Sequence, residues 1–263
     1  MSDSKAVLFE VNEGVGHITL NRPEALNALD PDLVTQATEA ITACERDQSI
    51  RAVLIDGAGP AFCGGGDLKF FHTGGEDLPA TVREMAHVFH TGVSRLARLD
   101  KPVVCAVHGA AAGGGLSWVC ASDLVLAAEG AKFKVAYSAI GFTMDGGSTY
   151  FLPRLVGLRR AVELAMTNRA LSAKEALDIG LITEVVPELE LHDRAAKQAA
   201  ELAAGPTWAL GRIKKLLHDS WNTTLETQLE QETRSVSEAS GRPDGREGVA
   251  AFMAKRRPTF TGK

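Results

Sequence analysis

Two short apolar runs, each followed by a cluster of glycines, constrain the fold of this 263-residue chain more than any other feature. Residues 52–56 (AVLID) and 103–107 (VVCAV) have the length and the β-branched content of buried strands. Strand-like and helix-like runs alternate up to about residue 157, and the pattern beyond it is almost wholly helical. Alternating strands and helices favour a parallel-rich sheet with crossover helices. We therefore predict an α/β fold with a helical C-terminal part.

Periodicity and capping residues predict the remaining elements. Asp30 and Pro31 are typical of a helix start, with Asp30 as the N-cap. Residues 72–78 (HTGGEDL), where two glycines and two acids interrupt the pattern, are the stretch expected to be disordered or mobile. We expect an α/β core over residues 1–190 and a helical region over residues 191–263. The other expected elements are a hairpin at 7–11 and 15–20, strands at 123–127, 132–135 and 182–186, and helices at 81–99, 159–167, 172–179, 191–204, 207–220, 223–239 and 244–254.

Composition and charge exclude several classes of protein. A net charge of -5 argues against a charge-dominated nucleic-acid surface. The four cysteines are scattered and none forms a CxxC pair, so neither a disulfide framework nor a zinc site is expected. The first residues lack the basic patch and apolar stretch of a secretory signal, and no apolar run approaches the roughly 20 residues of a membrane span. We expect a cytoplasmic protein without a membrane or nucleic-acid partner.

The two glycine clusters lie in residues 62–68 (FCGGGDL) and 112–116 (AGGGL), each where a strand is expected to pass into a helix. Backbone N–H groups are free at such transitions and favour negative charge. Two such turns side by side would direct two N–H groups at one oxygen, as in an oxyanion hole. The alternative is that the glycines only permit tight turns and close packing. Neither cluster has the pattern of a phosphate loop or of a dinucleotide fingerprint, so we predict no nucleotide or redox cofactor.

A single carboxylate, Asp145, stands in the run of residues 131–155, just before Gly146-Gly147-Ser148-Thr149. The flanking Phe142, Met144 and Tyr150 are expected to desolvate it partly, which would strengthen it as a base. The alternative is that Asp145 only caps a helix that begins at Gly146.

Several further motifs extend over nearly the whole chain. They are residues 21–29 (NRPEALNAL), 62–68 (FCGGGDL), 101–115 (from Lys101-Pro102 to the glycine triplet), 121–123 (ASD), 151–157 (FLPRLVG), 176–181 (ALDIGL) and 252–258 (FMAKRRP). Together they give the chain a resemblance to the crotonase superfamily, the enoyl-CoA hydratase/isomerase family. The resemblance implies a ClpP-like spiral of stacked ββα turns, a C-terminal helical trimerisation region, and a homotrimer or a homohexamer of two trimers. It also implies an acyl-CoA thioester substrate, with coenzyme A as part of the substrate and no separate cofactor.

The resemblance assigns roles to individual residues. The oxyanion hole of the family corresponds to the N–H groups of Gly66 and Gly114. Phe252 and Lys255 correspond to residues that reach coenzyme A, either in their own subunit or in a neighbouring one. The alternative for Lys255 is that it begins a solvated basic tail. The positions that correspond to the substrate and coenzyme A path are Ala25, Leu26, Gly64, Asp67, Leu68 and Tyr137.

The chain also departs from the family pattern. Hydratases of the family carry two glutamates, and Ser117 and Tyr137 stand in their places. Neither side chain is an effective general base at neutral pH, so hydration by the two-glutamate route is doubtful. Asp145 falls where the aspartate-bearing isomerases, the 1,2-epoxyphenylacetyl-CoA isomerases among them, keep their aspartate, and where the 4-chlorobenzoyl-CoA dehalogenases keep theirs. A histidine that acts in the hydrolytic step of those dehalogenases corresponds to His90.

We therefore predict an enoyl-CoA isomerase in which Asp145 moves a proton and Gly66 and Gly114 hold the thioester oxygen. One alternative is an enoyl-CoA hydratase. Another is a dehalogenase, although Gly66 and Tyr137 stand where those enzymes place a bulky aromatic residue and a tryptophan. A non-catalytic acyl-CoA or RNA binder is the alternative from another class. RNA binding is disfavoured because the helix expected at residues 31–48 carries one arginine and four acids.

Overall fold

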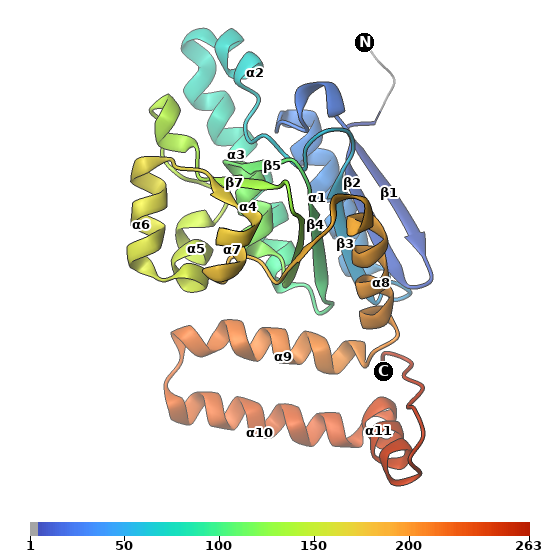
Figure 1. The fold of residues 1–263 in the computed structure, drawn as a ribbon. Coiled ribbons are helices and arrows are strands. Elements are labelled where there is room, and N and C mark those ends of the chain that lie inside the picture. The colour runs from blue at the N-terminus through green and yellow to red at the C-terminus, as the bar shows by residue number, and fades with distance from the viewer. Residues whose placement is uncertain (1–4) are drawn as a thin grey trace.

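A six-stranded sheet forms the centre of the computed structural model, which describes residues 5–263 (Figure 1). The spatial order of its strands is β1-β2-β3-β4-β6-β9. β1 and β2 pair antiparallel as a hairpin, and all the other neighbours in this sheet pair parallel, as predicted. The strands are β1 (Val7–Asn12), β2 (Val15–Leu20), β3 (Ala52–Gly57), β4 (Val103–Val107), β6 (Leu124–Ala128) and β9 (Glu184–Val186).

Helices cover both faces of this sheet, which is why every residue of β3 and β4 is buried. Alternate residues of a strand point to opposite faces. Val53 and Ile55 pack in the larger apolar cluster with α1 (Pro31–Arg46) and α3 (Leu78–Arg98), whereas Leu54 packs in the smaller cluster with α8 (Leu191–Ala203). α1 begins as predicted, with the side chain of Asp30 accepting the Leu33 N–H.

A second sheet of three short strands, in the order β5-β7-β8, holds the segments near the glycine turns. Its strands are β5 (Ala110–Ala112), β7 (Lys132–Lys134) and β8 (Leu171–Ser172). The expectation that residues 182–186 contain the only strand beyond residue 157 is wrong, because β8 pairs with β7. Strands of two or three residues are too short to show a period-2 pattern, and only pairing with distant segments defines them.

Short helices connect the strands. Residues 72–78, where the sequence pattern is interrupted, complete α2, form η2 and begin α3. The Asp67 carboxylate caps the start of α2 by accepting the N–H groups of Lys69 and Phe70. These connecting helices are η1 (Pro23–Ala25), α2 (Leu68–Thr73), η2 (Gly75–Asp77), α4 (Gly114–Ala121), η3 (Tyr137–Ile140), α5 (Ser148–Val156), α6 (Leu158–Thr167), α7 (Ala173–Asp178) and η4 (Glu188–Glu190).

The C-terminal helices extend away from the sheet, at the bottom of Figure 1. They are α9 (Thr207–Asp219), η5 (Ser220–Asn222), α10 (Leu225–Gly241) and α11 (Pro243–Met253). The boundary expected at residue 190 falls before α8, which packs on the sheet through Leu191, Ala195 and Ala199. None of the helices in residues 5–263 combines the length and apolar character that a membrane span requires.

Candidate active site

The two glycine clusters lie side by side, which is the arrangement that an oxyanion hole built from both turns requires. Cys63 and Ala111 form a parallel bridge, in which Cys63 O accepts the Ala112 N–H at 3.0 Å. Gly65 has a φ of +97°, and a Cβ built there would lie 2.9 Å from Ala112 O. Glycine is therefore required at this position both for its backbone angle and for the close approach of the two turns.

Each turn presents one N–H group that its own hydrogen-bond pattern leaves unused. In the bridge between Leu29 and Gly66, Gly65 O accepts from Leu29 N and Asp67 N donates to Leu29 O. The Gly66 N–H takes no part in this bridge. Gly114 is the first residue of α4, where an N–H group has no acceptor within the helix. Gly66 and Gly114 both line the same cavity.

This cavity has a volume of about 650 Å³ and is mainly apolar. Its wall includes Phe71, whose ring lies so close to Gly66 that a Cβ there would be 2.6 Å from it. Asp145 is the single carboxylate among the described residues that line the cavity. The wall also includes Gly64, Leu68, Arg83, Met85, Phe89, Tyr137 and Phe142.

A glycine turn positions Asp145 between η3 and α5. Gly146 and Gly147 have φ angles of +59° and +72°, and a Cβ at Gly146 would lie 2.4 Å from the Phe89 ring. The alternative that Asp145 caps a helix beginning at Gly146 is wrong. α5 begins at Ser148, Gly147 is its N-cap, and no side chain caps it. The side chain of Asp145 remains 35% exposed.

Ser117 and Tyr137, which replace the glutamates of the hydratases, contact Asp145. The Tyr137 hydroxyl donates a hydrogen bond to Asp145 Oδ1 at 2.5 Å. The Ser117 hydroxyl lies 3.3 Å from the Tyr137 hydroxyl and donates to Asp145 O at 3.2 Å. Burial, followed by the charge of Asp145, raises the pKa of Tyr137, so its phenol stays protonated as a donor. The sequence marked both positions only as departures from a family pattern, and their contact with Asp145 follows from the fold.

His90 approaches the same turn from α3. Its Nε2 accepts the Gly146 N–H at 3.0 Å and lies 4.0 Å from Asp145 Oδ2. The structure therefore brings together Asp145, Gly66, Gly114 and, behind the carboxylate, His90.

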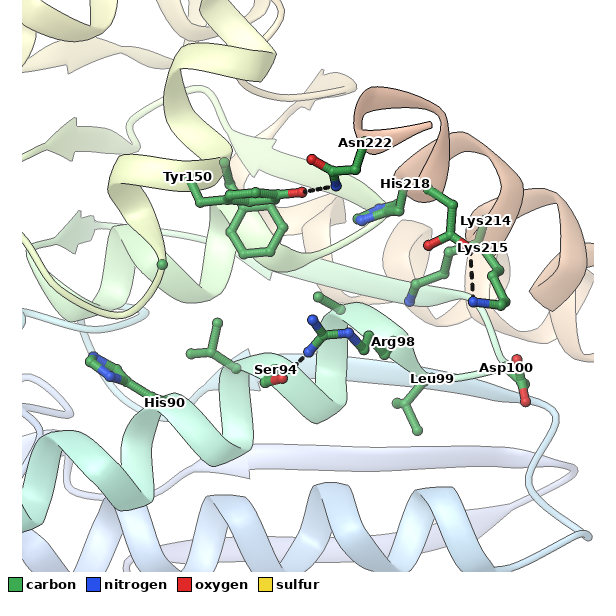
Figure 2. Close-up of a pocket in the computed structure, with 15 residues that line it drawn as sticks. His90, Ser94, Arg98, Leu99, Asp100, Tyr150, Lys214, Lys215, His218 and Asn222 are labelled. Atoms are coloured by element: carbon green, nitrogen blue, oxygen red, sulfur yellow. Dashed lines mark hydrogen bonds and ion pairs between the residues drawn. The ribbon is translucent and has the colours of Figure 1, made fainter. Parts of the chain in front are cut away.

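A second cleft of about 710 Å³ opens on the other side of His90, between α3, α5 and α9 (Figure 2). Two of its cations are paired: Lys214 with Asp123 and Lys215 with Asp219, each at 2.8 Å. The polar residues that line it include His90, Ser94, Arg98, Asp100, Tyr150, Lys214, Lys215, His218, Asp219 and Asn222.

The residues predicted for the coenzyme A path have different positions. Gly64 and Leu68 line the cavity, and Gly64 N donates to Leu26 O at 2.8 Å, with Ala25 adjacent in η1. Asp67 caps α2 and pairs with Arg22 at 2.9 Å, so its carboxylate has structural partners and does not line the cavity.

Phe252 is in the last turn of α11 and Lys255 follows its end, and Figure 1 shows α11 at the opposite end of the molecule from α2, whose Leu68 and Phe71 line the cavity. The Phe252 residue is 83% exposed. A contact of either residue with a ligand in the cavity would therefore require a second copy of the chain.

Comparison with known proteins gives consistent matches over nearly the whole chain. A model of the enoyl-CoA hydratase/isomerase family matches residues 10–263. The 1,2-epoxyphenylacetyl-CoA isomerase of Escherichia coli is 44% identical over 98% of each chain. The 4-chlorobenzoyl coenzyme A dehalogenase-2 of an Arthrobacter species is 35% identical over 95% of this chain and 91% of its own. A crystal structure of a putative enoyl-CoA hydratase/isomerase from Mycobacterium abscessus has a TM-score of 0.95 and 35% identity, over 98% of this chain and all of that one.

Proposed function

The chain belongs to the enoyl-CoA hydratase/isomerase family and has its crotonase fold, and from that premise we propose that it is an isomerase of unsaturated acyl-CoA thioesters. Asp145 is the acid/base that carries a proton between the two ends of the allylic system. The N–H groups of Gly66 and Gly114 hold the thioester oxygen.

One observation supports this proposal above the others: Asp145 is the single carboxylate among the described residues that line the cavity, and Gly66 and Gly114 line it too. Moving a proton from one carbon to another needs one base that becomes the acid for the return step. The Asp145 side chain is 35% exposed, and a neutral hydroxyl donates to its Oδ1. Such a carboxylate keeps lone pairs free to take a proton from the substrate.

The N–H groups supply the stabilisation that a carboxylate alone lacks. The protons next to a thioester are weakly acidic, so the negative charge that develops on the oxygen must be stabilised in the transition state. Each preorganised N–H donor contributes about 3–4 kcal/mol when it is aimed at such an oxygen. Gly66 and Gly114 line one cavity with Asp145, which supports their acting on one bound thioester.

Hydration is the less supported activity. The two-glutamate route needs carboxylates at positions 117 and 137, where this chain has Ser117, fully buried, and Tyr137, whose hydroxyl is already donated to Asp145. We expect weak or absent hydration of crotonyl-CoA. Glutamate at both positions should move activity toward hydration if the cavity accepts two more acids.

A dehalogenase is a second candidate because His90 lies within 4.0 Å of Asp145 and a named dehalogenase is among the relatives. In that reaction Asp145 would be the nucleophile, and a histidine would assist the hydrolysis of the aryl ester. The Nε2 of His90, however, is occupied by the Gly146 N–H. That bond favours the isomerase over the dehalogenase.

A panel of acyl-CoA thioesters with linear and ring-bearing acyl groups tests the proposal. Isomerisation, hydration of crotonyl-CoA and chloride release from 4-chlorobenzoyl-CoA would be measured side by side. We expect isomerisation to be the fastest activity, and an Asp145→Asn variant to lose it while still binding the thioester. Chloride release or hydration faster than every isomerisation would refute the proposal.

We also propose that the chain works as a homotrimer or homohexamer. The apolar stripe of α10, which includes Leu225, Leu229 and Val236, is exposed in a single chain and gains a partner only by contact with another copy. Such contact would also allow Phe252 or Lys255 to reach a neighbouring cavity. Sedimentation at micromolar concentration should give a species of three or six chains, and truncation near Gly205 should reduce solubility. A stable and active monomer would rule this assembly out.

A further inference from the structure

The peptide unit between Asp145 and Gly146 is held at both of its ends. Its carbonyl oxygen accepts the hydroxyl of Ser148 at 2.7 Å and that of Ser117 at 3.2 Å. Its N–H is donated to His90 Nε2 at 3.0 Å. Because a peptide unit is planar and rigid, fixing both ends fixes the plane that carries the Asp145 Cα and so restrains the direction in which the side chain leaves the backbone.

The direction of the bond to His90 determines the protonation of the imidazole. A nitrogen that accepts a hydrogen bond must carry a lone pair, so His90 is neutral and its proton is on Nδ1. The same Nε2 lies 4.0 Å from Asp145 Oδ2, which is too far for a hydrogen bond. His90 therefore contacts the turn as an acceptor and does not donate to the carboxylate.

We propose that His90 is a positioning residue: in its neutral form, it holds the turn that directs the Asp145 carboxylate into the cavity. This role rests on the proposed function of Asp145 as the acid/base. Protonation of His90 removes the acceptor of the Gly146 N–H and places a cationic N–H near Asp145 Oδ2. The turn then loses the hydrogen bond between the Gly146 N–H and His90, and the nearby cation makes the Asp145 carboxylate a weaker base.

The other charged groups around His90 mostly have partners of their own. Arg95 pairs with Glu45, and Lys215 pairs with Asp219. Figure 2 shows His90 at one end of the cleft, with Arg98, Lys214 and Lys215 toward the other end. The ionisable groups that line the second cleft beside His90 are Arg98, Asp100, Tyr150, Lys214, Lys215, His218 and Asp219. Glu45 and Arg95 line an adjacent groove that His90 also borders, and Asp145 faces His90 from the turn.

Two substitutions separate positioning from chemistry. In a His90→Gln variant the amide oxygen can still accept the Gly146 N–H, but the side chain takes up no proton near neutral pH. We expect kcat within about threefold of wild type, with little change in KM. A His90→Phe variant has no acceptor, and a misplaced carboxylate should lower kcat by about 10- to 100-fold with little change in KM. These assays use the thioester on which the wild-type enzyme isomerises fastest.

His87 provides the matched control, because it is exposed on the same helix one turn earlier. His87→Gln and His87→Phe should leave kcat and its pH profile unchanged. If His90→Gln is as inactive as His90→Phe while both melt at the wild-type temperature, the imidazole itself takes part in the reaction and the proposal is overturned. Full activity of His90→Phe would overturn it as well.

Nitrogen NMR of the wild-type protein, with ¹⁵N-labelled histidine, tests the same inference without turnover. The His90 signals are assigned by their loss in His90→Gln. We expect a protonated Nδ1 and an unprotonated Nε2 at mildly alkaline pH, and the opposite tautomer would overturn the proposal. This measurement needs no substrate. It therefore tests the contact of His90 with Gly146 even if the thioester panel refutes the isomerase proposal.

Discussion

Asp145 and Asp56 are two carboxylates in contrasting surroundings. The Asp145 side chain is 35% exposed and accepts a hydrogen bond from one neutral hydroxyl. The Asp56 side chain is 7% exposed, at the end of β3, and two imidazoles approach its Oδ2: His17 Nε2 at 2.9 Å and His192 Nδ1 at 3.4 Å. The first arrangement leaves a carboxylate free to accept a proton, and the second keeps a buried charge ionised.

The pKa of Asp56 shows which of its contacts dominate. Burial acts to raise it, but the hydrogen bonds from His17 and His192 and the charge of His17 together hold it well below the ordinary value. A buried carboxylate is tolerated only when partners of this kind compensate its desolvation. The imidazoles around Asp56 stabilise its ionised form, whereas Asp145 lacks such close partners and keeps lone pairs that can accept a proton.

The largest expected effect is that of Asp145→Asn on catalysis. Removal of a general acid/base lowers kcat by about 10³-fold. The free energy of unfolding should stay within about 0.5 kcal/mol of wild type, because the side chain is partly exposed and the Tyr137 hydroxyl can still donate to the amide oxygen. Steady-state kinetics on a thioester that the wild type isomerises measure the fall in kcat, and urea unfolding measures the free energy of unfolding. Activity within tenfold of wild type would show that Asp145 is not the acid/base.

Asp56→Asn should have the opposite profile. Its removal takes a buried charge from two imidazoles and should lower the free energy of unfolding by about 2–3 kcal/mol, with kcat within about twofold of wild type. Asp178→Asn is the control, because Asp178 pairs with Lys174 at 2.7 Å on the exposed surface, and such pairs contribute less than about 1 kcal/mol. If both variants lose the same free energy of unfolding, the buried contacts of Asp56 add no more stability than an exposed ion pair.

Tyr137→Phe tests how much Asp145 depends on its single donor. A hydrogen bond to a charged group contributes about 1.5 kcal/mol, so its loss should lower kcat about tenfold with little change in KM. Tyr150→Phe is a matched control, since Tyr150 lines the other cleft and not the cavity. A larger fall in kcat for Tyr150→Phe than for Tyr137→Phe would indicate that the reaction takes place in the second cleft and not in the cavity that contains Asp145.

The smallest expected effect is on stability against pH, and it concerns the cluster around Asp56. The lowered pKa of Asp56 adds stability that is present above about pH 4 and is lost as the pH falls through the folded value. The hydrogen bond to Asp56 raises the pKa of His192, which adds stability present below about pH 6.5 and lost as the pH rises through the raised value. The cluster should therefore stabilise most between about pH 4 and 6.5.

The loss above this range should be less than about 1 kcal/mol, because His192 is 59% exposed and solvent screens its charge. Urea unfolding from pH 5.5 to 8.5 measures it, and His192→Gln should make the curve flatter. If the free energy of unfolding of the wild type rises with pH over this range, while that of His192→Gln falls, the stabilising role of His192 is contradicted.

The sequence by itself was sufficient for features that neighbouring residues encode. The hairpin of β1 and β2, the buried β3 and β4, and the start of α1 at Asp30 follow from apolar periodicity, turn residues and a capping side chain. The sequence also showed that each of the two glycine clusters follows a buried strand, and the structure shows that the two turns meet. Asp145 stood out because no other acid lies near it in the chain.

Only the tertiary structure decided how these residues are paired. His90 and Gly146 are 56 residues apart in the chain, and nothing local to either indicates the hydrogen bond between them. The same holds for Tyr137 with Asp145, where the direction of a side chain matters, and for β8, which exists only by pairing with β7. Local periodicity reports which face of an element is buried, whereas a hydrogen bond depends on distances of a few tenths of an ångström that packing alone sets.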